Sequence, residues 1–225
     1  MILQRRMTDN QFKTHLIVGV ILTVTLKLIL YSVASLTIPD YLPWGYLSRI
    51  LLWIWMFLLW LYVRYMEKQP FLCLKEKKHT VFFYLLSAVI LTAVILGLNL
   101  FPEIFTRMKM PLADMHIQAE MMAYQHERPF LLILTAITAG IVEELIFRGY
   151  MLPRLDTLLN NQWAAIIIVS VLYAALYYTY GTWLNILIPF LGSIVFGFFY
   201  LKYRSLTVVV LARICALLIL GAIRF

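Results

Sequence analysis

The chain has 225 residues, of which 63% are hydrophobic and 13% are charged. Soluble domains contain about 45–50% apolar and about 25% charged residues, so this composition excludes an ordinary soluble globule. The apolar residues form seven runs, each close to the roughly 20 residues that one helix needs to cross a bilayer. The runs are continuous rather than alternating, which excludes a membrane β-barrel. The sequence therefore predicts an all-α, polytopic helical membrane bundle.

The first predicted span follows a basic N-terminus, as a secretory signal would. Its apolar stretch is longer than the roughly 7–15 residues of a signal core, so we expect a retained membrane anchor. The predicted spans are 15–38, 45–63, 80–101, 129–147, 163–180, 183–201 and 206–223. We divide the chain into an N-terminal segment, a three-span region and a four-span core, at 1–14, 15–128 and 129–225.

The net charge of +8 is explained by membrane topology. If the N-terminus is cytoplasmic, twelve of the 19 basic residues lie in inner segments, four in outer segments and three within spans. This bias follows the positive-inside rule and predicts a cytoplasmic N-terminus and an outer C-terminus. The partner that the charge implies is the lipid bilayer, not nucleic acid. The basic inner loop 64–79 either marks topology alone or also contacts anionic headgroups.

The two cysteines, Cys73 in the inner loop and Cys215 in the last span, are predicted to lie in separate environments. They therefore form no framework disulfide, and without nearby histidines they form no zinc site. We expect neither a metal nor a cofactor.

The outer segment 102–128 contains five of the ten methionines. Within it, Ile117, Met121 and Tyr124 share one stripe of a short predicted helix, which Asp114 could begin. Two interpretations remain open. The helix lies flat in the membrane interface or against the bundle, or its adaptable methionine face docks a partner protein.

Ionisable residues inside spans are costly and usually mark function. We expect Lys27 and Arg49 to reach the interface or to pair with a neighbouring helix. The fourth span is different, because Glu143 and Glu144 are followed by Arg148 within an apolar helix. Glu144 and Arg148 share a face at a spacing that favours an ion pair.

Glu143 points about 100° away from Glu144 around the helix and lacks that partner. This makes Glu143 the candidate general base. The alternative is structural: the Glu144–Arg148 pair locks helix packing, and another span satisfies Glu143. The spacing alone does not separate these interpretations.

The residues Glu143, Glu144, Phe147, Arg148 and Gly149 match the pattern E-E-x-x-F-R-G. This segment resembles the first motif of the CPBP family of intramembrane endopeptidases, which includes the CAAX prenyl proteases and the bacteriocin-immunity (Abi) proteins. The resemblance implies that the first glutamate activates water for attack on a peptide carbonyl. It also implies that the second glutamate and the arginine support it, and that histidines from two later helices complete the site.

The resemblance covers about 140–217, and both family histidines are replaced. The second motif, F-x-x-x-H, aligns best with Tyr173 to Tyr177, and the third, H-x-x-x-N, aligns with Arg213 and Leu217. Arginine stays protonated and offers no base, so an Arg213–glutamate bridge would turn a catalytic site into a structural strut. The Tyr177 hydroxyl could still donate to an oxyanion.

Three functions follow from these observations. The first is a catalytically impaired CPBP-like protein that binds another membrane or cell-envelope protein through 102–128 or its transmembrane faces. Such partners include a cell-wall hydrolase, a sensor kinase or a bacteriocin-immunity target. The second is an active glutamate-dependent CAAX-type endopeptidase. The third is a transporter or lipid-binding bundle, for which Asn185 and Pro189 supply the one helix-break signal. We expect a multi-pass protein of a bacterial plasma membrane.

Overall fold

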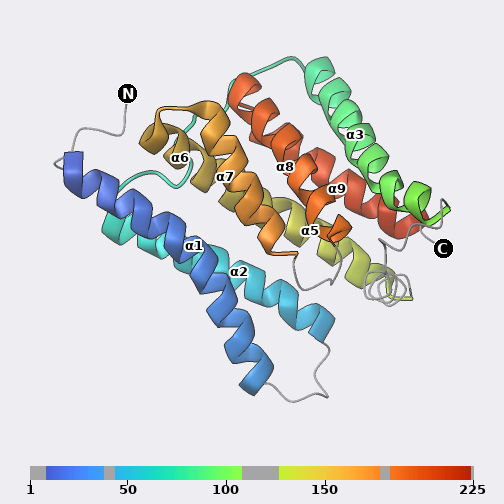
Figure 1. Cartoon of the computed structure of the whole chain (residues 1–225), viewed down its shortest axis with the longest axis horizontal. Coiled ribbons are helices and arrows are strands. Elements are labelled where there is room, and N and C mark those ends of the chain that lie inside the picture. Colours follow the sequence, from blue (N-terminus) through green and yellow to red (C-terminus); the bar gives the residue numbers. More distant parts are fainter. Residues whose placement is uncertain (1–8, 38–43, 108–126, 178–182, 224–225) are drawn as a thin grey trace.

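The computed structural model describes residues 9–37, 44–107, 127–177 and 183–223, and within these ranges every regular element is a helix. The all-α prediction is therefore confirmed. In chain order the helices, including the π-helices η1 and η2, are α1 (Asp9–Thr37), α2 (Trp44–Tyr62), η1 (Val63–Glu67), α3 (Val81–Arg107), α5 (Pro129–Glu144), η2 (Leu145–Met151), α6 (Leu152–Leu159), α7 (Gln162–Ala175), α8 (Leu184–Tyr203) and α9 (Leu206–Ile223) (Figure 1).

The seven predicted spans correspond to five apolar helical segments long enough to cross a membrane and two shorter ones. The long segments are Lys13–Leu36, Trp44–Glu67, Val81–Leu100, Pro129–Leu159 and Ile186–Tyr203, and the shorter ones are Gln162–Ala175 and Leu206–Ala222. Apolar side chains on the outside of α3, such as Val81 and Phe82, are more than 70% exposed, as expected for a surface that faces lipid. The chain is a multi-pass membrane protein.

Two helix boundaries and one break signal differ from the sequence prediction. The fifth span was expected to reach residue 180, but α7 ends at Ala175. The third helix continues through Pro102 to Arg107, and α8 keeps Pro189 inside an unbroken helix. The break signal in the sixth span therefore produces no broken helix. The predicted stripe of Ile117, Met121 and Tyr124 lies outside the described residues.

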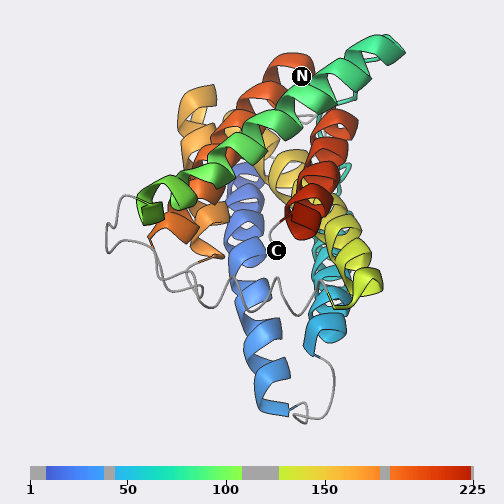
Figure 2. The same ribbon diagram turned by 90° about the vertical axis from the view of Figure 1, so that its right-hand side faces the viewer.

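The helices pack as a connected series rather than around one axis. α1 packs on α2, α2 on α5, and α5 on α9, which in turn contacts α3 and α8. α7 packs closely on α8 and on α6. Figure 1 shows α3 along one edge of the bundle and the α1–α2 pair at the opposite edge, and in Figure 2, seen from the first edge, α3 crosses in front of the other helices. α5 and its continuation through η2 therefore lie between the two edges and contact both halves.

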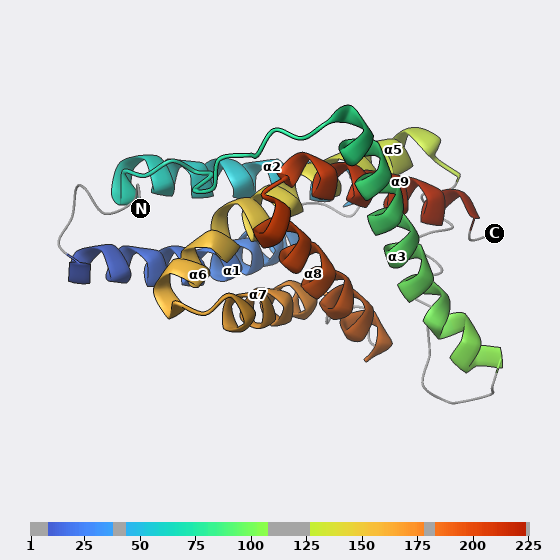
Figure 3. The same cartoon turned by 90° about the horizontal axis from the view of Figure 1, so that it is seen from above.

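A buried charge cluster joins η1, which follows α2, to the end of the fourth span. Glu67 in η1 accepts hydrogen bonds from the Tyr150 hydroxyl at 2.6 Å and from Arg154 Nη2 and Nε at 2.7 and 2.9 Å. All three side chains are nearly inaccessible to solvent. Figure 3 shows that the start of α1 and the end of α2 lie at the same end of the molecule, which also carries α6.

The connection between η1 and α3 is held at both of its ends. Arg154 Nη1 and Nη2 donate to the carbonyls of Phe71 and Pro70, which follow η1. Farther along, Glu76 accepts hydrogen bonds from the Ser205 hydroxyl and the Thr207 amide, both at 3.1 Å, and so satisfies donors at the start of α9. A connection with these contacts is part of the packed structure rather than a free loop.

Gly19 in α1 gives a test of this packing. A Cβ atom at Gly19 would collide with the Tyr150 hydroxyl and with Glu67 Oε1, whereas a Cβ at Gly97 in α3 would meet nothing within 4 Å. We expect Gly19→Ala to destabilise the fold by about 1–3 kcal/mol because neither group can move without breaking the cluster. Gly97→Ala is the matched control, and we expect a gain of up to about 1 kcal/mol from helix propensity. Thermal unfolding in detergent micelles measures both, and equal effects of the two substitutions would contradict this role of Gly19.

Candidate functional site

The glutamate pair lies where the fourth span changes its helical form. Glu143 and Glu144 end α5, and the next seven residues form the π-helix η2, which contains Arg148. Glu143 is 6% exposed, and Glu144 and Arg148 are fully buried. A π-helix has a wider turn than an α-helix and often occurs at functional sites. The irregular turn therefore coincides with the motif that the sequence singles out.

Glu144 and Arg148 form the ion pair predicted from their spacing. Arg148 Nε lies 3.1 Å from Glu144 Oε2, and Arg148 Nη1 donates to Glu144 Oε1 at 3.3 Å. The guanidinium lies 4.7 Å from the centroid of the Tyr173 ring and 5.6 Å from that of Phe196. Aromatic faces attract a desolvated cation, so α7 and α8 help to hold Arg148 in place.

Glu143 is held by groups from two other helices. Its Oε2 atom accepts hydrogen bonds from the Tyr173 hydroxyl at 2.9 Å and the Tyr177 hydroxyl at 3.2 Å. Arg213 Nη2 lies 3.7 Å from the same oxygen and donates to the two hydroxyls at 2.6 and 2.9 Å. Two phenol groups and one guanidinium therefore contact the same carboxylate oxygen.

Local backbone features bring these groups together. α9 approaches α5 closely at Gly140, where a Cβ atom would collide with the Ile214 side chain, and Arg213 is the neighbour of Ile214. Tyr173 lies in the last turn of α7, and Tyr177 lies four residues later in the turn that follows the helix, where its amide donates to the Ala174 carbonyl. The early end of α7 thus places Tyr177 at the level of Glu143.

Two further cations act on Glu143. The charges of Lys27 in α1 and Arg49 in α2 attract this carboxylate, and the Lys27 ammonium lies 5.2 Å from the centroid of the Trp55 ring. Their positions within spans predict that these residues reach the interface or pair with a neighbouring helix. Lys27 does the second, because Trp55 belongs to α2.

The structure brings all five predicted site residues into one region. Glu143, Tyr177 and Arg213 form one cluster, and the Glu144–Arg148 pair lies beside it through the Tyr173 ring. Tyr173 was treated only as part of the second motif, yet it makes the shorter of the two tyrosine hydrogen bonds to Glu143. Its four-residue separation from Tyr177 was the available signal, since residues at that spacing share a helix face.

The arrangement is suited to holding a carboxylate, because two hydroxyl donors and a cation compensate its buried charge. His15 and His79, the two histidines within the described ranges, lie elsewhere, with contacts to Tyr62 and Tyr203. Across the described ranges, no group of three His, Cys, Asp or Glu side chains is placed to hold a metal ion.

Cys73 adjoins the second buried cluster, where Arg154 Nη1 lies 3.0 Å from its Sγ atom. Burial raises the pKa of the Cys73 thiol, and the positive charge of Arg154 offsets part of that rise. The thiol is therefore less ionised at neutral pH than that of a free cysteine, whose pKa is about 8.5. Because the thiolate is the nucleophile, its alkylation is correspondingly slow.

We expect the pH–rate profile for alkylation of Cys73 by iodoacetamide to have a midpoint above that of a free cysteine. The measurement uses a Cys215→Ser background, so that Cys73 is the one thiol left. The same variant denatured in detergent is the control, because unfolding removes both the burial and Arg154. A folded-state midpoint at or below the denatured one would contradict the prediction.

A double-mutant cycle tests whether the Glu143–Arg213 pair supports the fold. We expect Arg213→Met to destabilise the protein by about 3–5 kcal/mol, because it leaves a buried carboxylate without its nearest cation. Glu143→Gln/Arg213→Met should recover a clear part of that loss, measured by unfolding in micelles. Strict additivity of the two single effects would mean that the side chains are not coupled.

Comparison with known proteins identifies the region that carries this site. Residues 125–219 match the family model described as type II CAAX prenyl endopeptidase Rce1-like. No curated protein and no solved structure gives a significant match. The matched residues include α5, η2, α6, α7, α8 and most of α9, and so contain both glutamates, both tyrosines and Arg213. Over residues 125–219 the chain is therefore similar to the Rce1-like type II CAAX prenyl endopeptidases.

Proposed function

We propose that the chain is a catalytically impaired Rce1-like membrane protein that acts by binding another membrane or cell-envelope protein. The observation that carries the proposal is the set of contacts on Glu143 Oε2. Two tyrosine hydroxyls and Arg213 surround the atom that a catalytic glutamate would direct at water. A carboxylate held in this way joins α5, α7 and α9 as a strut.

The identity of the surrounding groups supports the same proposal. In the alignment argued from the sequence, Tyr177 and Arg213 occupy the positions of the family histidines. Neither residue can accept a proton near neutral pH in the way that imidazole does. Removal of a single transition-state donor typically costs about 100–1,000-fold in rate, so loss of two catalytic imidazoles would leave little turnover.

We place the protein in a bacterial plasma membrane, with a cytoplasmic N-terminus and a membrane or envelope protein as partner. The proposed contact surfaces are the outer segment 102–128 and the lipid-facing sides of the helices. Large apolar side chains are exposed on α3, where a partner helix could replace lipid. The proposed partner is a protein such as a cell-wall hydrolase, a sensor kinase or a bacteriocin-immunity target.

The alternative function is an active glutamate-dependent endopeptidase, and one observation favours it. The motif of Glu143, Glu144 and Arg148 is intact and lies on the π-helical turn. Tyr177 would then donate to the oxyanion in place of a histidine. This mechanism requires Glu143 to exchange its tyrosine contacts for a water molecule and a substrate carbonyl.

Cleavage in proteoliposomes separates the two functions. We expect wild-type protein and Glu143→Gln to be equally inactive on a prenylated CAAX peptide and on a transmembrane peptide, because the tyrosines and Arg213 hold the Glu143 carboxylate. Asp156→Asn, which removes a carboxylate of α6 outside the site, is the matched control for loss of one negative charge. Cleavage by wild type and by Asp156→Asn, but not by Glu143→Gln, would overturn the proposal in favour of the active enzyme.

Affinity purification from the native membrane tests the binding role. We expect a stoichiometric membrane or envelope protein to co-purify with wild type and with Glu143→Gln alike. A protein that accumulates only with Glu143→Gln, and that is found shortened in wild-type membranes, would instead be a substrate.

A further inference from the structure

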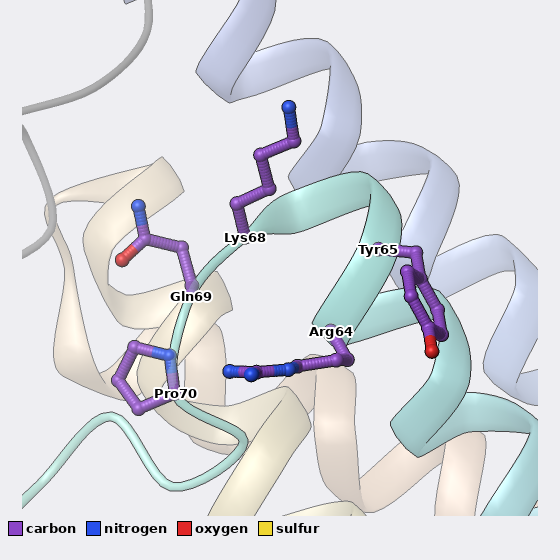
Figure 4. Close-up of a pocket in the computed structure, with 5 residues that line it drawn as sticks. All are labelled: Arg64, Tyr65, Lys68, Gln69 and Pro70. Atoms are coloured by element: carbon purple, nitrogen blue, oxygen red, sulfur yellow. The ribbon is translucent and has the colours of Figure 1, made fainter.

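A hollow with a volume of about 550 Å³ opens beside the end of α2, away from the glutamate site. Arg64, Tyr65, Lys68, Gln69 and Pro70 line it (Figure 4). Figure 4 shows Arg64 and Lys68 projecting on different sides of the hollow, with Gln69 and Pro70 on the segment that leaves the helix. Its volume lies within the range of small-molecule sites.

After α2, buried and exposed side chains lie on different faces of the helical segment. Val63 and Glu67 are buried four residues apart, whereas Arg64 and Lys68, also four residues apart, are exposed. Lys68 has a left-handed backbone conformation (φ 53°), which ends the helix and turns the chain into the segment of Gln69 and Pro70. The two cations therefore border a hollow formed at a helix end.

Both walls of the hollow are fixed by the buried charge cluster. The helix wall is held through Glu67, which binds Tyr150 and Arg154. The loop wall is held because Arg154 also donates to the carbonyls of Pro70 and Phe71, and the Phe71 ring stacks on Tyr150 with centroids 5.5 Å apart. Little ordering of the backbone is needed before a ligand binds, which favours affinity.

The cations of the hollow are free to bind an anion. Throughout the described part of the chain, neither Arg64 nor Lys68 has a carboxylate within ion-pair distance. The Arg154 guanidinium, by contrast, binds Glu67 and the carbonyls of Phe71 and Pro70. The hollow therefore carries two unneutralised positive charges beside a cluster that is already neutral.

The position of the hollow indicates the source of the anion. It lies at the end of the apolar segment Trp44–Glu67, where a helix leaves the membrane. Tyr65 and Met66 are 68% and 52% exposed, as expected at a boundary between lipid and water. At the boundary between lipid and water, the anionic groups of a membrane are the phosphates of its phospholipids.

We propose that this hollow binds the headgroup of one anionic phospholipid from the leaflet that adjoins the start of α1 and the end of α2. The Arg64 guanidinium pairs with the phosphate through two parallel N–H groups, and the Lys68 ammonium adds a second charge. The site is separate from the glutamate cluster, and its existence does not depend on whether Glu143 is catalytic.

Native mass spectrometry of the full chain in mild detergent tests the proposal with phosphatidylglycerol and phosphatidylcholine as probes. We expect one molecule of phosphatidylglycerol to bind in preference to phosphatidylcholine. Arg64→Gln/Lys68→Gln should weaken that binding by roughly tenfold or more, since each basic side chain at a membrane surface contributes severalfold to anion affinity. Arg64→Lys should give a smaller loss, because it keeps the charge and removes the paired N–H groups.

Lys75→Gln/Lys78→Gln is the matched control, because it removes two exposed cations from the same connection. We expect binding within twofold of wild type for this variant. An equal loss in both double variants would mean that the basic connection attracts lipid without a defined site, and would overturn the proposal. Displacement of the lipid by millimolar inorganic phosphate, with no preference for phosphatidylglycerol, would overturn it in favour of a free-phosphate site.

Discussion

A carboxylate in the interior of a membrane protein must be compensated by nearby donors and cations, and this requirement shapes the region around Glu143. Burial of an isolated ion is so unfavourable that partners must come from whichever helices can reach it. Tyr173 comes from α7, Tyr177 from the turn that follows it and Arg213 from α9, so Glu143 of α5 links three helices. The close approach of α9 at Gly140 is part of the same solution.

The fourth span also compensates a second buried carboxylate, that of Glu67. Tyr150 in η2 and Arg154 in α6 both bind Glu67 in η1, the segment that follows α2. The π-helix η2 starts directly after Glu144 and contains Tyr150, so it connects the two clusters, and its wider turn changes which residues face each neighbour. The Glu143 cluster thus faces α7 and α9, while the Tyr150–Arg154 cluster faces α1, α2 and the connection that follows η1.

The similarity to the Rce1-like family and the chemistry of the site depend on different features of the molecule. The match over residues 125–219 concerns the helical framework and its glutamate motif. Catalysis depends on what the carboxylate contacts, and here these groups are phenols and a guanidinium, which donate hydrogen bonds and accept no proton near neutral pH. Tyrosine and arginine side chains hold the helices together here, because both donate to a buried carboxylate.

The sequence by itself determined the helical membrane class, the approximate positions of the seven apolar segments and the Glu144–Arg148 pair. These features depend on continuous hydrophobicity and on four-residue spacing, which are local properties of the chain. Only the tertiary structure decided that α7 ends at Ala175, that Tyr173 binds Glu143 and that Glu67 pairs with Arg154. Those contacts join residues 30 and 87 positions apart and depend on how helices end, tilt and rotate against one another, which the spacing of residues along a single helix leaves open.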